Sequence, residues 1–127
     1  MEQNGQWKEL ENSNFNFVDL GRPAIFIIPV VKLKHEMDGK TVEQALIQFL
    51  MKNYQAYSTL NVQNFGAWMD GKKVIHYDES KLFKVSFVGK ERITPLAEFL
   101  SKIAKSINEQ CIYFEAGQYA ALIYPAD

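Results

Sequence analysis

The feature that most constrains the fold is a pair of strand-like runs in residues 60–77, joined by the dipeptide Asp70-Gly71. Glycine takes the positive φ that tight turns need and aspartate tolerates it, so Asp-Gly between strand-like runs predicts a β-hairpin. The chain continues in residues 81–88, where apolar and polar residues alternate. This period of two is typical of a strand with one covered face and one open face. The centre of the chain therefore predicts an antiparallel hairpin.

Two amphipathic helices flank this hairpin. Thr41 followed by Gln44 forms a capping box, which predicts a helix that ends around residues 53–57. After the hairpin, Thr94 is the expected N-cap of a second helix, with Pro95 in the first helical position. Both helices carry apolar residues at helical spacing, so each has one face to pack on a sheet.

Further strands are expected at Ala24–Leu33, Cys111–Glu115 and Tyr119–Tyr124, with residues 34–40 as a loop. The order is then β-α-β-β-α-β plus a C-terminal strand, which predicts an α+β fold. It is the ferredoxin-like arrangement, with two helices on one face of an antiparallel sheet. We expect one domain over residues 24–127, preceded by an N-terminal arm over residues 1–23.

The other face of such a sheet has no helix to cover it. The alternation in the 111–115 strand turns Tyr113 and Glu115 to this open face. A sheet face without helices leaves a large surface exposed, and a ligand or another subunit normally covers such a surface. We therefore expect an oligomer.

Composition excludes several classes of protein. The chain has 127 residues and a net charge of -1, which gives no support to nucleic-acid binding through phosphate contacts. A single cysteine, Cys111, excludes an internal disulfide and fits a cytoplasmic location. The apolar run at residues 25–31 is far shorter than a membrane span, and the N-terminus does not have the pattern of a secretory signal.

Glu79 and Glu115 are the candidate functional carboxylates, because each lies in or beside an apolar strand. A carboxylate in such surroundings needs a specific partner, and a ligand's amino group or ribose diol would supply one. Glu79 also shares the parity of the core-facing residues of its strand, so without a bulge its side chain would point toward the core. The alternative is a surface glutamate at a strand end, paired with Lys72 or Lys81.

Trp68, which follows Gly66-Ala67, is either a stacking platform for a base or cation or an ordinary core residue. No metal site is expected, because the His35, Glu36 and Asp38 cluster matches no closed ligand spacing. The glycines form neither a P-loop nor a dinucleotide-binding fingerprint.

The segment 108–115, running on to 120–124, resembles the end of the phage-encoded enzymes that degrade S-adenosylmethionine (SAM). These enzymes were formerly called SAM hydrolases and are now understood as SAM lyases. The spacing between Glu79 and Glu115 also resembles the family's pair of active-site glutamates. The resemblance covers roughly the last half of the chain.

The resemblance implies a subunit similar to PII-type signalling proteins, assembled as a homotrimer with ligand sites between subunits. It implies cleavage of SAM to methylthioadenosine and homoserine lactone, which counteracts host restriction-modification and needs no cofactor. Glu79 and Glu115 would be catalytic, and Trp68, Tyr77 and Tyr113 would bind the substrate. The family carries a tyrosine near the position of Trp68, so a missing phenolic hydroxyl would leave a binder without turnover, unless Tyr77 or Tyr113 replaces it. A non-catalytic nucleotide sensor or sponge and a small protein-interaction or inhibitor protein are therefore the alternatives.

Overall fold

The computed structural model describes residues 9–10, 13–15, 17, 20–54, 56–69, 71–87, 90–117 and 119–126, with the backbone alone for 56, 63–68, 76–78, 90 and 119. The elements follow in the order β1 (Arg22–Pro29), α2 (Val30–Leu33), β2 (Glu36–Met37), β3 (Lys40–Thr41), α3 (Val42–Asn53), β4 (Ala56–Met69), β5 (Ile75–Phe87), a 3₁₀ turn (Lys90–Arg92), α4 (Ile93–Ser106), β6 (Ile112–Ala116) and β7 (Tyr119–Ile123).

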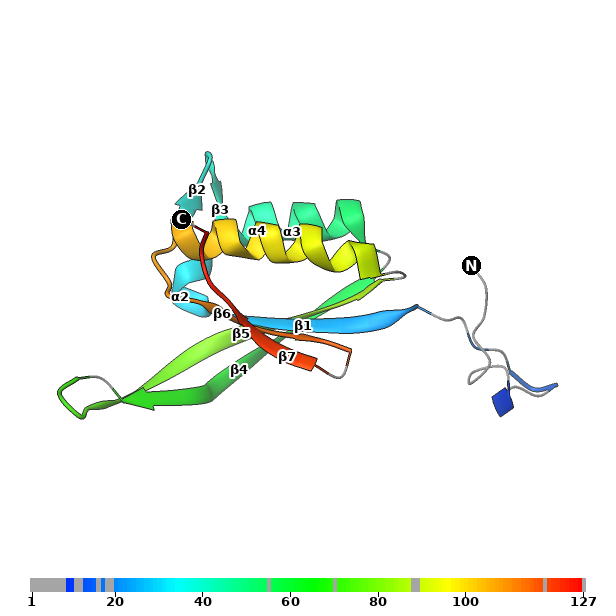
Figure 1. The fold of residues 1–127 in the computed structure, drawn as a ribbon, viewed down its shortest axis with the longest axis horizontal. Coiled ribbons are helices and arrows are strands. Elements are labelled where there is room, and N and C mark those ends of the chain that lie inside the picture. The colour runs from blue at the N-terminus through cyan, green and yellow to red at the C-terminus, as the bar shows by residue number, and fades with distance from the viewer. Residues whose placement is uncertain are drawn as a thin grey trace.

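Five of these strands form one antiparallel sheet in the order β4-β5-β1-β6-β7. The helices α3 and α4 lie side by side on one face of this sheet, and no helix of the described residues covers the other face (Figure 1). All neighbouring strands of this sheet are antiparallel and both long helices lie on one side, which confirms the predicted ferredoxin-like arrangement. The last strand, β7, extends the sheet beyond β6.

The core lies between this sheet and the two helices. Phe26 of β1 stacks on Phe83 of β5 with ring centroids 5.1 Å apart, and both side chains are fully buried. Leucines and isoleucines from the helices close over them, and the fully buried members are Leu46, Leu50, Leu96, Leu100 and Ile103. Burial of each such side chain stabilises the fold by about 1.5–3 kcal/mol.

The starts of the two helices were predicted with different success. The capping box of α3 is confirmed, because Thr41 Oγ1 accepts from the Gln44 amide and the Gln44 side chain accepts from the Thr41 amide. The N-cap of α4 is Arg92, so the prediction of Thr94 was wrong by two residues. Pro95 is still tolerated, because amides of the first helical turn have no partner within the helix.

The first strand is shorter than predicted. It ends at Pro29, which is the N-cap of the short helix α2, so residues 30–33 are helical rather than extended. The predicted loop over residues 34–40 contains the small hairpin β2–β3, which turns at Asp38 and Gly39 with φ of 56° and 83°. Glycine accepts such a φ without strain and aspartate is among the few other residues that do.

The long hairpin β4–β5 is confirmed and extends beyond the helices (Figure 1). Met69 pairs with Ile75, so the connection is longer than a two-residue turn. Asp70 of the predicted Asp70-Gly71 turn lies outside the described residues. The pairing shifts between Val62 and Gly66 of β4. The irregularity therefore lies in β4, opposite the segment of β5 where the sequence had suggested a bulge.

None of the helices in the described part of the chain is long and apolar enough to cross a membrane.

Candidate functional site

Two residues on the open face of the sheet, Tyr113 and Glu115, are joined by a hydrogen bond. Their neighbours in β6, Ile112 and Phe114, are buried on the helix side, so alternation turns Tyr113 and Glu115 the other way, as predicted. The Tyr113 hydroxyl donates a hydrogen bond to Glu115 Oε2 at 2.8 Å. This bond to the carboxylate, reinforced by partial desolvation and by the negative charge of Glu115, raises the pKa of the Tyr113 phenol. The hydroxyl is therefore held protonated beside a carboxylate.

Glu115 lies in a cross-strand row on the open face. Ile25 of β1 pairs with Glu115 on one side and with Lys84 of β5 on the other, and Ala120 of β7 completes the row. Glu115 and Lys84 are thus separated by one strand, on the same face. The Glu115 carboxylate is partly exposed and keeps acceptor positions beyond the one that Tyr113 occupies.

Glu79 lies on β5, opposite the irregular part of β4, and its side chain is exposed. It has the parity of Phe83, yet it is exposed, and it lies one residue beyond Ser80, where the pairing of β5 with β1 ends. The sequence predicted a core-facing Glu79 only for a strand without a bulge, and the β4–β5 pairing is irregular opposite this residue. Lys81, one of its suggested partners, instead forms an ion pair with Glu43 of α3 at 2.5 Å.

One chain does not bring Glu79 and Glu115 together. Lys84 shares the open face with Glu115, whereas Glu79 lies five positions away along β5 and has the opposite parity. Two strand spacings and five residues of rise place their backbones roughly 20 Å apart. A site that uses both carboxylates would need them from two copies of the chain.

Trp68 and Tyr77 belong to the same part of the hairpin as Glu79. Their backbones pair with His76 and Ala67, respectively, beyond the irregularity. Their side chains lie outside the described part of the structure, so whether Trp68 stacks on a ligand or packs in a core stays a prediction.

An apolar row crosses the open face beside Glu115, and the sequence analysis did not single it out. Leu60 pairs with Leu82, Leu82 pairs with Ile27, and Tyr113 pairs with Leu122. Continuing the β1–β6 register by one step beyond the Phe26–Phe114 pair brings Ile27 level with Tyr113, which joins the two parts of the row. Leu60 is 61% exposed and Leu122 is 52% exposed. The parity of Leu82 against the core-facing Phe83 was the signal that could have revealed this row.

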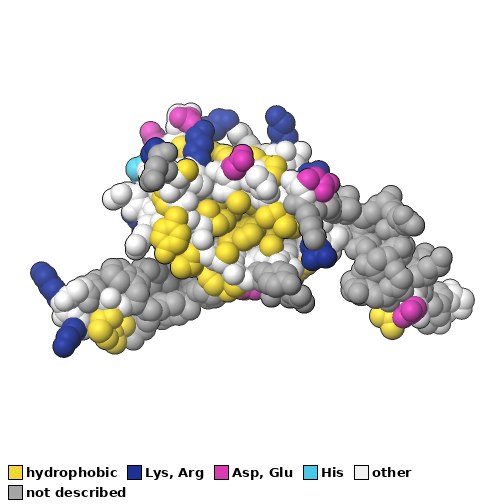
Figure 2. Space-filling model, viewed as in Figure 1, with side chains coloured by type: hydrophobic (Ala, Val, Ile, Leu, Met, Phe, Trp, Pro, Cys, Tyr) yellow, Lys and Arg dark blue, Asp and Glu magenta, His cyan; other side chains and the backbone are white. Residues whose placement is uncertain are grey.

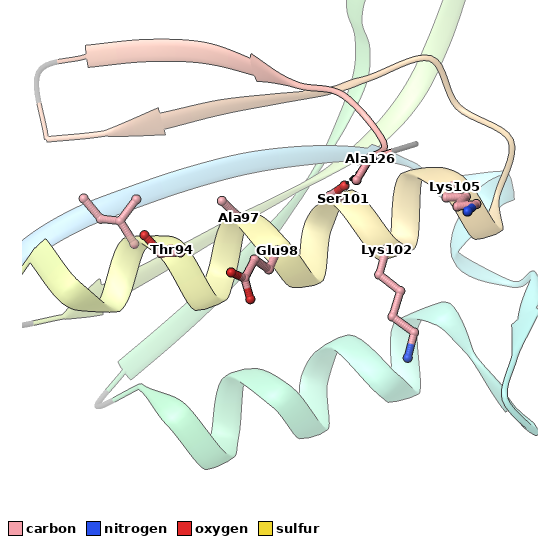
Figure 3. Close-up of a pocket in the computed structure, with 8 residues that line it drawn as sticks. Thr94, Ala97, Glu98, Ser101, Lys102, Lys105 and Ala126 are labelled. Carbon is pink, nitrogen blue, oxygen red and sulfur yellow. Dashed lines mark hydrogen bonds between the residues drawn. The ribbon is translucent and has the colours of Figure 1, made fainter.

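A depression of about 550 Å³ lies elsewhere, on the outer side of α4 next to the C-terminal segment. Ser101 lies beside Ala126 of this segment (Figure 3). Its Oγ accepts a hydrogen bond from the Ala126 amide at 2.9 Å and donates one to the Tyr124 carbonyl at 3.2 Å. Hydrophobic side chains gather over α4 and β7 on this side of the molecule (Figure 2). Neither candidate glutamate lines the depression, so we regard it as a surface groove formed where the C-terminal segment crosses α4.

The described residues contain no group of three histidine, cysteine or acidic side chains that could hold a metal ion. The free Cys111 is partly exposed.

No family model matches the chain, and no curated protein matches it in sequence. Solved structures do match it in fold. One is a phage SAM lyase in complex with S-methyl-5'-thioadenosine, with a TM-score of 0.57 and 10% identity. Another is a phage SAM lyase in the apo state, with a TM-score of 0.58 and 11% identity. Each match covers 87% of this chain and 94% of the other. The resemblance that the sequence suggested is therefore confirmed at the level of the fold.

Proposed function

We propose that this protein is a SAM lyase. The observation that carries the proposal is the fold shared with phage SAM lyase over 87% of the chain. The sequence supports it independently, because the spacing of Glu79 and Glu115 resembles the pair of glutamates in that family. SAM carries a sulfonium and an ammonium, and carboxylates are suitable partners for such a cation.

The reaction asks little covalent chemistry of the protein. The substrate's own carboxylate oxygen attacks its γ-carbon, the bond between that carbon and sulfur breaks, and the bonding electrons go to sulfur. Neutral methylthioadenosine leaves, and the amino acid part closes to homoserine lactone with its ammonium intact. No external proton or redox partner is required. The protein's task is to hold the carboxylate folded back onto the γ-carbon and to exclude water.

We propose the following roles for the two carboxylates. The remaining acceptor positions of Glu115 would bind the substrate's ammonium or ribose diol, while Tyr113 fixes the rotamer of the carboxylate. Glu79 would reach the same substrate from a neighbouring copy, because within one chain it lies on the other face of the sheet. Trp68 and Tyr77 would accompany Glu79 as residues that contact the adenine or the sulfonium.

We propose that the copies assemble as a homotrimer that covers the exposed Leu60 and Leu122 and the partly exposed Leu82 and Tyr113 of this row, of which Ile27 is already buried in the single chain. Exposed leucines in a contiguous row favour a covered surface. An intracellular enzyme of this kind would deplete SAM and so deprive a host's restriction-modification system of its cofactor.

Incubation of the purified protein with SAM, followed by chromatography, tests the activity. We expect methylthioadenosine and homoserine lactone in equal amounts, well above the spontaneous rate. Homoserine in place of the lactone from the earliest time points would instead indicate hydrolysis. Folded protein that forms no product above the spontaneous rate would exclude the lyase.

Trp68 favours a second candidate, a nucleotide-binding protein without turnover. An indole offers a stacking face but no hydroxyl, and the family carries a tyrosine near this position. Under this alternative, calorimetry would detect SAM binding while the ligand is recovered unchanged. The Trp68→Tyr variant would then gain turnover, whereas a lyase that does not need this hydroxyl would already be active as the wild type.

A further inference from the structure

A second groove lies on the helix side of the molecule, away from Glu115. It has a volume of about 400 Å³ and runs between α3 and α4. Two of its lining residues are Phe49 and Phe99, whose rings stack with centroids 4.2 Å apart and planes 5° apart. Both rings are only partly buried, so the groove has an aromatic floor that the helices leave accessible.

The small β2–β3 hairpin forms one end of this groove and contacts both helices. The Lys40 ammonium of the hairpin donates a hydrogen bond to Gln48 Oε1 of α3 at 2.5 Å. Asp38, at the turn of the hairpin, forms an ion pair with Lys102 of α4 at 3.3 Å. In Figure 3, Lys102 extends from α4 toward α3. The hairpin therefore holds the position of the groove's polar rim relative to its floor.

The rim is positively charged. Lys40, Lys52 and Lys102 line the groove, and Asp38 is the acidic residue among the described lining residues. Lys40 has a neutral amide as its partner, and the Lys102–Asp38 pair is exposed, so neither ammonium is strongly neutralised. Three ammonium groups around an aromatic floor are complementary to a ligand that has several negative charges and a ring.

We propose that this groove binds an aromatic polyanion of the nucleotide class, with its ring against Phe49 and Phe99 and its phosphates at the three lysines. The volume lies within the usual range for small-molecule sites, and lysine is a common phosphate ligand. The chemistry differs from that of the proposed SAM site, where carboxylates face a cationic substrate. The inference therefore does not depend on the proposed function.

Calorimetric titration of the full chain tests it, with adenosine triphosphate, inorganic tripolyphosphate and adenosine as probes. We expect saturable binding of one adenosine triphosphate per chain, with weaker binding of each of the other two. A Lys52→Gln/Lys102→Gln variant is expected to lose about tenfold or more in affinity. The matched control is Lys34→Gln/Lys73→Gln, which changes net charge equally and leaves the groove intact. Phe49→Leu should weaken the binding of adenosine triphosphate but not the binding of tripolyphosphate.

Equal losses in the two double variants would reveal non-specific charge attraction and overturn the proposal. Loss of adenosine triphosphate binding in Glu115→Gln would place the nucleotide in the other site and would also overturn it. If adenosine triphosphate shows no saturable binding, the proposal is also overturned. SAM turnover is measured separately and should be unchanged in the groove variants, so this proposal and the proposed lyase activity can fail independently.

Discussion

Tyr113 and Glu115, two residues apart on one strand, are joined by a 2.8 Å hydrogen bond from the phenol to the carboxylate. Alternation along β6 makes this contact possible, because it puts both side chains on the open face of the sheet. In the proposed site, this bond would make Tyr113 a positioning residue for Glu115.

The pKa of Tyr113 provides the first test. The phenol is held above its ordinary value of 10.0, chiefly by its bond to Glu115. In Glu115→Gln the pKa should fall back toward that value, because the amide carries no charge. A pH titration followed by NMR of tyrosine labelled at Cζ measures this. An unchanged pKa in the variant would show that the bond does not form in solution.

The same pair predicts how stability depends on pH. Because the folded protein binds this proton more tightly than the unfolded chain, the contribution of the bond is fully present below about pH 10 and is lost as pH rises through the folded pKa. The difference in free energy of unfolding between wild type and Tyr113→Phe should therefore shrink only in this alkaline range. If the difference in free energy of unfolding stays constant across this alkaline range, the hydrogen bond between Tyr113 and Glu115 is not the source of the raised pKa.

The helix starts provide a matched pair of stability variants. Thr41→Ala removes a side-chain cap and should lower the free energy of unfolding by about 1 kcal/mol. Thr94→Ala is the control, because Thr94 lies inside the first turn of α4 and does not cap it. Urea unfolding of the two variants measures both effects. A larger loss for Thr94→Ala would mean that α4 begins where the sequence alone suggested.

The apolar row on the open face predicts a change of assembly. Leu122→Asp puts a charge into the proposed interface and should dissociate the oligomer into folded monomers. Met51→Asp is the control, because Met51 is similarly exposed but lies on α3, on the helix side. Size-exclusion chromatography with light scattering gives the mass of each. An unchanged mass for Leu122→Asp, or a monomeric wild type, would contradict an interface at this row.

The sequence predicted the fold well where local chemistry decides the structure. The capping box at Thr41, the alternation around Phe83 and the alternation at Tyr113 each report a contact within a few residues, and each was interpreted correctly. Pro29 and Asp38-Gly39 carried equally local signals, for the end of a strand and for a turn. The β-branched residues that follow Pro29 nevertheless led to the prediction of a longer strand.

The candidate site was harder to predict, because it depends on distances that alternation does not provide. Parity indicated that Glu79 faces the helices, yet its exposure depends on where the pairing with β1 ends and on the irregularity in β4, which are properties of the packed molecule. The sequence also indicated a pair of glutamates without showing that one chain holds them on opposite faces of the sheet. In the proposed site, the second glutamate would come from a neighbouring copy.

Mixing two inactive variants tests most directly whether Glu79 and Glu115 from neighbouring copies complete one SAM site. Glu79→Gln and Glu115→Gln, each purified alone, should form no methylthioadenosine. When they are unfolded together and refolded as mixed oligomers, random assembly should restore about a quarter of the wild-type activity, because that share of interfaces contains both native glutamates. A mixture that stays inactive, while wild type taken through the same refolding cleaves SAM, would contradict a site shared between copies.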